Sequence, residues 1–217
     1  MTKAKVWGVL EGIAIVAVLI LNVAKVPPFA TGTLLFVLPV AWLSLRLRRV
    51  RWRDLGLTLP AHWRRLAWIG ALGATGLQAL GTWVIEPALK AAGLQPPQVE
   101  GLAKLASGGI AGFVLSILIG VVIGGLLEEM VFRGYMISRV GDAIGTRRGA
   151  TVGVALSSLY FGLSHWYQGA TGAIEAGLVG VMTGVGYVLT GGNLFLPIVV
   201  HAVGDVVGIA LLGIAHH

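Results

Sequence analysis

The segment IAGFVLSILIGVVIGGLLEEMVFRGYMIS, residues 110–138, decides the fold, because it is long, apolar and charged in only one short stretch. The hydrocarbon core of a bilayer is about 30 Å thick and an α-helix rises about 1.5 Å per residue, so about 20 apolar residues span it. The segment reaches that length, and its apolar residues do not alternate with polar ones as in a strand. It is expected to be a membrane-spanning helix.

Two adjacent acids, Glu128 and Glu129, lie inside this segment together with Arg133. A charged side chain at the centre of a membrane helix costs about 2.5 to 3.5 kcal/mol on insertion scales, so a compensating environment is expected. Glu129 and Arg133 are four residues apart and share one helix face, whereas Glu128 is turned away from Glu129 by about 100°. Glu129 is the better partner for Arg133, and Glu128 the better candidate to face a cavity.

The rest of the chain has the composition of a membrane protein. Hydrophobic residues make up 56% and charged residues 12% of the 217 residues, and the mean hydropathy is +0.87. A water-soluble core cannot hide so much apolar surface. We therefore expect an all-α fold, a polytopic transmembrane helical bundle in which residues 1–217 form a single integral membrane domain. About seven spans are expected, at Val6–Val23, Phe29–Leu47, Leu66–Ile85, Ile110–Ser138, Ala150–Tyr167, Gly172–Leu189 and Leu194–Ile214.

The net charge of +7 comes largely from one short connection between the second and third spans. Basic residues beside hydrophobic spans are a topology signal, so the lipid bilayer is the expected partner and nucleic acid is not. Their distribution predicts an N-terminus in the cytoplasm. The expected location, a bacterial or archaeal plasma membrane, does not follow from the charges. The basic residues clustered in that connection are Arg46, Arg48, Arg49, Arg51, Arg53, Arg64 and Arg65.

The chain has no cysteine, which excludes disulfides and thiolate chemistry.

Three further polar residues lie in predicted spans, namely His165, His201 and Asp205. His201 and Asp205 are four residues apart, so they share a helix face. Any one such residue is as often a packing residue as a functional one, but six on three helices exceed what packing needs. A converging site is expected. Glycines that recur in the third, fourth and sixth spans, Gly120, Gly124 and Gly125 among them, are interpreted as packing residues without a catalytic role.

Three chemistries can use these residues. In the first, Glu128 is a general base that activates water, His165 helps to hold that water, and His201 donates a hydrogen bond to the oxyanion. In the second, the histidines and a carboxylate bind zinc, although the chain has no His-Glu-x-x-His motif. In the third, the same groups relay protons or ions for transport, although the chain shows no repeated halves.

Three motifs in series resemble those of the CPBP family, the CAAX protease and bacteriocin-processing or Abi family. They are Glu-Glu-Met-Val-Phe-Arg-Gly at 128–134, Phe-Gly-Leu-Ser-His at 161–165 and His-Ala-Val-Gly-Asp at 201–205. The motif-bearing core runs from approximately 113 to 209. The resemblance implies a CAAX-protease-like fold and a glutamate-type intramembrane endopeptidase that needs no metal and no cofactor.

The resemblance also implies roles for the six residues. Glu128 would activate water with help from His165, and His201 with residue 205 would stabilise the oxyanion. Glu129 and Arg133 would support the geometry of the site. The chain has Asp205 where the eukaryotic prenyl-protein proteases carry Asn, and an ionised carboxylate cannot donate a hydrogen bond. Asp205 is either protonated or, as we prefer, stands behind His201, where it orients the ring and favours imidazolium.

The function expected from the sequence is hydrolysis of a peptide bond in a membrane-associated protein or peptide. The substrate is left open, including whether it is prenylated. An alternative of another class is a non-proteolytic membrane scaffold or immunity protein that keeps the motif residues for folding. A zinc-dependent protease and a proton-coupled transporter are the remaining alternatives.

Overall fold

The computed structural model describes residues 3–27, 29 and 32–215, and these residues contain helices and loops but no strand. The predicted all-α fold is confirmed. The α-helices are α1 (Lys3–Val23), α2 (Thr33–Arg48), α3 (Trp63–Leu80), α4 (Glu86–Ala91), α5 (Glu100–Ala106), α6 (Gly109–Ile119), α7 (Ser138–Ile144), α8 (Thr146–Ser164), α9 (Gly169–Leu189) and α10 (Phe195–Ala215). Two 3-10 helices, η1 (Trp52–Leu55) and η5 (Trp166–Gln168), and three π-helices, η2 (Gly81–Ile85), η3 (Gly120–Glu128) and η4 (Met130–Ile137), complete the described elements.

Four helical stretches in the described part of the chain are long and apolar enough to cross a membrane. They are Trp63–Ala91, Gly109–Ile144, Trp166–Leu189 and Phe195–Ile214, which correspond to the third, fourth, sixth and seventh predicted spans. The other three predicted spans form the helices α1, α2 and α8. The count of seven spans is therefore not confirmed, because α2 has only 16 residues and two arginines in its last turn. The apolar part of α1, Leu10–Val23, is also short.

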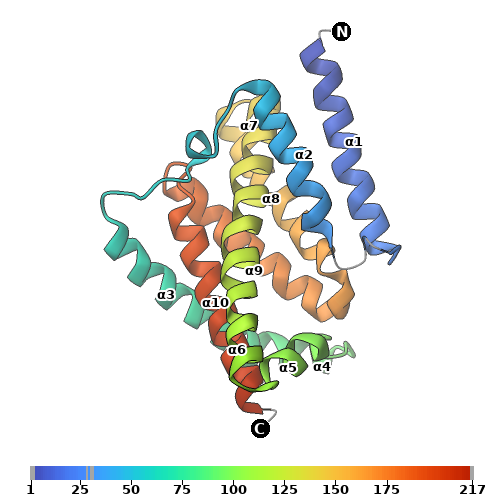
Figure 1. Ribbon diagram of the computed structural model, residues 1–217, viewed down its shortest axis with the longest axis vertical. Helices are drawn as coiled ribbons and strands as arrows, with labels where there is room; N and C mark the ends of the chain where they lie inside the picture. Colours follow the sequence, from blue (N-terminus) through green and yellow to red (C-terminus); the bar gives the residue numbers. More distant parts are fainter. Residues whose placement is uncertain (1–2, 28, 30–31, 216–217) are drawn as a thin grey trace.

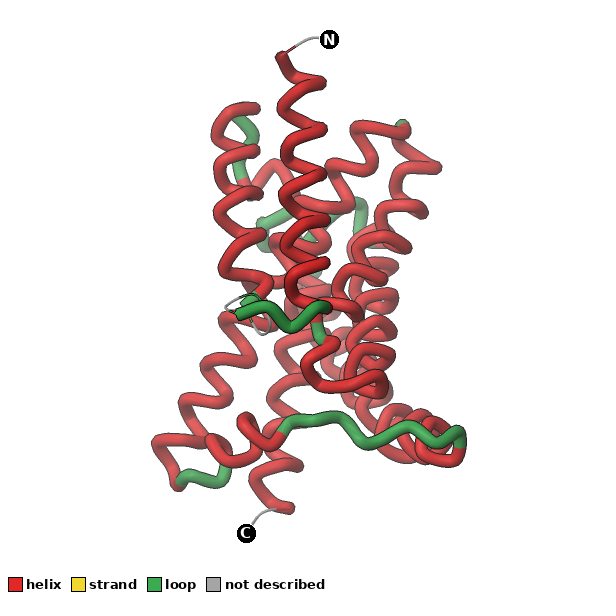
Figure 2. The backbone as a smooth tube through the Cα atoms, turned by 90° about the vertical axis from the view of Figure 1, so that its right-hand side faces the viewer, coloured by secondary structure: helices red, strands yellow, loops and turns green. Residues whose placement is uncertain are grey.

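The stretch Gly109–Ile144 is the central element of the bundle. Figure 1 shows it running along the long axis of the molecule, from α6 through η3 and η4 to α7. On one side η3 packs against α10, and α10 packs against α3. On the other side η4 packs against α8, which packs against α9. Figure 2, turned by 90°, shows α1 standing at the outside of this arrangement. Residues from η3, η4, α8 and α10 can therefore meet in the middle.

The middle of this long helix is π-helical rather than α-helical, which the sequence did not predict. From Gly120 to Ile137 the backbone forms η3 and η4, separated by Glu129 alone. π-Helices have i→i+5 hydrogen bonds and are frequent at functional sites. The wider turn changes which side chains lie above one another, so the α-helical angle between Glu128 and Glu129 is only approximate here.

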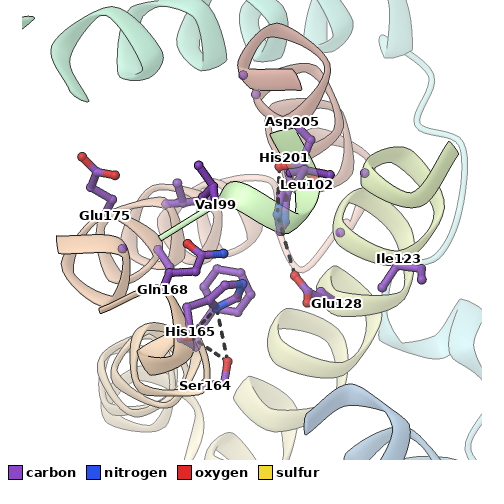
Figure 3. A pocket seen from close by; sticks show the side chains of 18 of the residues that line it. Val99, Leu102, Ile123, Glu128, Ser164, His165, Gln168, Glu175, His201 and Asp205 are labelled. Atoms are coloured by element: carbon purple, nitrogen blue, oxygen red, sulfur yellow. Dashed lines mark hydrogen bonds and ion pairs between the residues drawn. The ribbon is translucent and has the colours of Figure 1, made fainter. Parts of the chain in front are cut away.

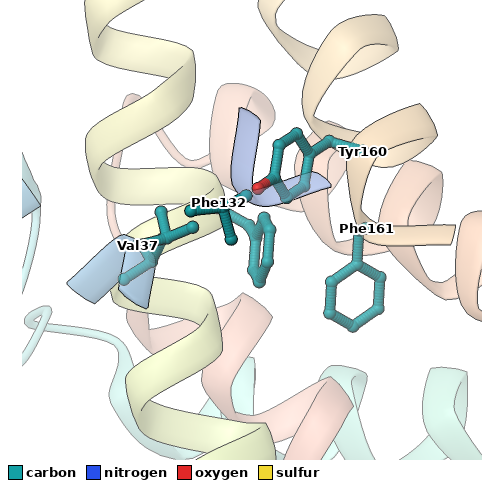
Figure 4. Close-up of a cluster of buried hydrophobic side chains, with 6 residues drawn as sticks. Val37, Phe132, Tyr160 and Phe161 are labelled. Atoms are coloured by element: carbon teal, nitrogen blue, oxygen red, sulfur yellow. The ribbon is translucent and has the colours of Figure 1, made fainter. Parts of the chain in front are cut away.

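An apolar core on one side of the site is built from α1, α2, η4 and α8. It consists of the buried residues Val18, Val37, Val131, Phe132, Tyr160 and Phe161. Figure 4 shows Phe132 from η4 between Val37 of α2 and the two aromatic residues of α8. The rings of Phe132 and Phe161 pack edge to face with centroids 5.0 Å apart, a favourable geometry for aromatic pairs. This core fixes Phe161, which also contacts the polar site.

A buried polar group that the sequence did not predict connects α1 and α2 to the central helix. The carboxylate of Glu11 accepts hydrogen bonds from Ser44 Oγ at 2.9 Å, from Arg48 Nη2 at 2.9 Å and from the hydroxyl of Tyr135. Glu11 is 6% exposed, so these bonds replace its contact with solvent. We call Glu11, Ser44, Arg48 and Tyr135 the Glu11 cluster.

Candidate functional site

Glu129 connects the central helix to α10. Its Oε1 lies 3.0 Å from Arg133 Nη1 and 2.7 Å from Nδ1 of His201. The side chains of Glu129 and Arg133 are fully buried. An ionised carboxylate only accepts hydrogen bonds, so Nδ1–H of His201 donates to Glu129. The predicted pair of Glu129 with Arg133 is present, and Glu129 has a second task in holding the ring of His201.

Arg133 is held by charge and by an aromatic face. Its guanidinium carbon lies 4.5 Å from the ring centroid of Phe161, within the range of a cation–π interaction. No hydrogen-bond partner with suitable geometry is found for its three side-chain nitrogens among the described residues. The ring of Phe161 also meets His201 edge to face, with centroids 5.6 Å apart. Phe161, the first residue of the second motif, thus lies between Arg133 and the histidine of the third.

A cavity of about 650 Å³ lies beside this buried group. Glu128, His165, His201 and Asp205 all line it, as Figure 3 shows. Glu129 and Arg133 do not belong to the lining. The two neighbouring glutamates are therefore separated in the way that their spacing indicates, with Glu129 in the buried pair and Glu128 at the cavity.

Two carboxylates face the second ring nitrogen of His201. Glu128 Oε2 and Asp205 Oδ1 each lie 3.8 Å from Nε2, which is too long for a direct hydrogen bond but close enough for electrostatic interaction. The hydrogen bond to Nδ1 of His201 comes from Glu129, whereas Asp205 faces Nε2, so the preferred role of Asp205 in orienting the ring stays a prediction. The four-residue spacing does bring Asp205 next to His201. The spacing does not determine which ring nitrogen of His201 lies near Asp205, because that depends on the rotation of the ring.

His165 lies at the end of α8 and turns its ring to the cavity. Its Nδ1 is 2.9 Å from the carbonyl oxygen of Phe161 and 3.3 Å from Ser164 Oγ. A carbonyl only accepts, so Nδ1–H donates to it. In the neutral ring this leaves Nε2 as a hydrogen-bond acceptor. His165 can therefore accept a hydrogen bond from a water or a substrate group in the cavity.

Glycines of η3 make the space for Asp205. A Cβ at Gly124 would lie 2.2 Å from Asp205 Oδ2, and a Cβ at Gly120 would lie 2.9 Å from Asp205 Cβ. The close helix approach that the glycines predict is therefore present between η3 and α10. The interpretation as mere packing was incomplete, because the approach also seats a side chain of the site.

Sequence reasoning missed two further acids of the same cavity, Glu86 and Glu175. Glu175 lies in the apolar stretch Trp166–Leu189. The signal that identified Glu128, an acid inside an apolar span, applies equally to Glu175 and would have found it. Among the residues described, no group of three or more His, Cys, Asp or Glu side chains is arranged so that it could hold a metal ion.

Residues 110–207 match a family of known proteins, described as type II CAAX prenyl endopeptidase, Rce1-like. The match covers somewhat less than half of the chain and includes all three motifs and all six predicted site residues. No curated protein and no solved structure matched the chain.

Proposed function

We propose that this protein, whose residues 110–207 match the type II CAAX prenyl endopeptidase family, is an intramembrane endopeptidase that cleaves a membrane-associated protein or peptide. The observation that carries the proposal is the cavity in which Glu128, His165, His201 and Asp205 meet. Glu128, His201 and Asp205 belong to helices that are long and apolar enough to span a membrane. Polar groups within membrane-spanning helices are tolerated where they line a water-filled cavity, and a hydrolase needs that water as its nucleophile.

Glu128 acts as the general base of the reaction. Its carboxylate faces the cavity and takes part in no hydrogen bond with the other described residues. It takes a proton from a bound water while the water oxygen attacks the carbonyl carbon of the peptide bond. His165 accepts a hydrogen bond from the same water through Nε2. When the C–N bond breaks, Glu128 returns the proton to the leaving amine.

His201 stabilises the oxyanion that forms in the attack. Because Nδ1–H donates to Glu129, a neutral ring would offer only a lone pair at Nε2. Three carboxylates close to the ring, those of Glu128, Glu129 and Asp205, favour imidazolium, in which Nε2–H can donate to the oxyanion. One such donor contributes about 10² to 10³ in rate in other hydrolases. In this account Asp205 acts on the charge of His201.

The position of Glu128 and His165 supports this proposal over the scaffold alternative. A scaffold or immunity protein needs the buried group of Glu129, Arg133 and His201 to hold its helices together. It has no need for Glu128 and His165 at a cavity. The zinc alternative is separated by measuring the metal content of the purified protein and its sensitivity to chelators, because the mechanism proposed here uses no metal.

The experiment that tests the proposal is a comparison of membrane peptides in cells that carry wild-type protein, Glu128→Ala or Glu100→Ala. Glu100 is an exposed acid outside the cavity lining and serves as the matched control. We expect a cleavage product that is present with wild type and Glu100→Ala and absent with Glu128→Ala. Identical peptides in all three strains, with Glu128→Ala folded in the membrane, would contradict the proposal and favour a scaffold.

A further inference from the structure

The cavity of Glu128 contains two carboxylates for which the proposed reaction has no use. Glu86 is the first residue of α4, and Glu175 lies in the first half of α9. Both line the cavity, and both belong to stretches that are long and apolar enough to span a membrane. Acids in such segments are costly and usually mark a site with a partner.

Neither acid has a partner within the described part of the chain. None of the ion pairs between the described residues includes Glu86 or Glu175. The Oε1 atom of Glu175 is buried and has no hydrogen-bond partner there, although the large majority of buried polar atoms in proteins have one. Both carboxylates line the same cavity, where two like charges repel each other. A cation between them would relieve both defects.

The cavity itself supplies no such cation. Its described lining includes four carboxylates, those of Glu86, Glu128, Glu175 and Asp205, and neither lysine nor arginine. Figure 3 shows Glu175 on the opposite side of the view from Glu128, with Val99 and Gln168 between them. His201 lies next to Glu128 and Asp205, so a positive charge on its ring offsets the negative charge at that end of the cavity. The end at Glu175 is complementary to a positive charge brought by a ligand.

We propose that Glu86 and Glu175 form a subsite that binds a lysine or arginine side chain of the substrate. The inference rests on the proposed function, because it requires a peptide to enter this cavity. Lysine and arginine have apolar stems that can lie along the apolar part of the lining, such as Leu178 and Val179, while the charged end reaches the carboxylates. The hydrogen bonds formed there are charge-assisted and stronger than neutral ones. The substrate is then a membrane-associated peptide with a basic residue to one side of its scissile bond.

The test measures binding without cleavage. Glu128→Gln protein in discs of neutral phosphatidylcholine is titrated with a fluorescent apolar peptide that contains one lysine, and with the same peptide containing norleucine. Empty discs give the background. We expect the lysine peptide to bind about tenfold more tightly, since norleucine keeps the stem and lacks the charge. Adding Glu175→Gln or Glu86→Gln removes this preference, whereas adding Glu100→Gln, the exposed control, preserves it.

Equal affinities for the two peptides would overturn the subsite, as would a preference for lysine that survives Glu86→Gln and Glu175→Gln together. Binding of the lysine peptide no stronger than to empty discs would overturn it as well. Failure of the proposed function has a different signature, because the binding assay uses a variant without the general base. In that case the lysine preference is seen while membrane peptides of wild-type and Glu128→Ala cells are identical.

Discussion

The Glu11 cluster and the cavity group of Glu128 and Asp205 are both polar and both lie within the helical bundle, but they differ in how far their polar atoms are paired. Glu11 accepts hydrogen bonds from a serine, an arginine and a tyrosine. Glu128 and Asp205 approach His201 only to 3.8 Å and face open space. A fully paired group stabilises helix packing, whereas an unpaired one at a cavity is available to a ligand or a reaction.

Two neighbouring residues, Glu128 and Glu129, belong to different kinds of polar group, one unpaired at the cavity and the other buried and paired. Glu129 is buried and paired with Arg133 and His201, so it resembles Glu11 in its role. Glu128, next to it in the chain, belongs to the cavity. Substitutions of paired residues, namely Glu129, Arg133 and the Glu11 cluster, should therefore mainly lower stability. Substitutions of the cavity group should mainly lower the rate of cleavage.

Removal of Arg133 should have a large effect on stability, as large as removal of its partner Glu129. Arg133→Leu leaves the carboxylate of Glu129 buried beside a hydrophobic side chain, and breaking a buried pair in this way costs about 3 to 5 kcal/mol. The measurement is the free energy of unfolding in mixed micelles, with Arg65→Leu, at an exposed position, as the control. A loss no larger than that of the control would show that the Glu129–Arg133 pair does not hold the bundle.

Removal of the charge of Glu11 should have a smaller effect. Glu11→Gln weakens three hydrogen bonds around one buried group, one of them with a charged partner, and should lower the free energy of unfolding by about 1 to 3 kcal/mol. The rate of cleavage per folded molecule should stay unchanged. A loss of cleavage at full stability would instead place the Glu11 cluster with the cavity group and remove the distinction drawn above.

Asp205→Asn should have a smaller effect on stability than Arg133→Leu and Glu11→Gln. The side chain of Asp205 is 32% exposed and has no hydrogen bond with a described residue, so an amide of the same shape fits in its place. The free energy of unfolding should change by less than about 0.5 kcal/mol, as for most replacements outside a packed core. Cleavage should fall by about three- to tenfold, because one carboxylate that favours imidazolium at His201 is lost. Unchanged cleavage would leave Asp205 without the role proposed for it.

Local features of the fold and site could be predicted from the sequence. The apolar length of residues 110–138 located the central helix, because the thickness of a bilayer sets that length. The pair of Glu129 and Arg133 followed from spacing along one element. The count of seven spans is not confirmed where helices are short or partly polar, as in α2, because an apolar helix packed against other helices has the same sequence pattern as one in lipid.

Features that depend on how the helices meet could not be predicted. The contact of Glu129 with His201 joins residues of the central helix and α10, and no spacing along either helix encodes it. The approach of Glu86 to the cavity of Glu175 likewise depends on the packing of separate helices. The cytoplasmic position of the N-terminus stays a prediction.

The central claim, that Glu128 performs chemistry while Glu129 holds the structure, is tested most directly by the rate of cleavage per folded molecule in Glu128→Gln, with Glu129→Gln measured beside it. The account predicts that Glu128→Gln folds with wild-type stability and loses about 10² to 10⁴ in rate, the usual contribution of a general base. Glu129→Gln should instead lose about 3 to 5 kcal/mol of stability. A folded Glu128→Gln that cleaves at the wild-type rate, or two variants that behave alike, would contradict the account.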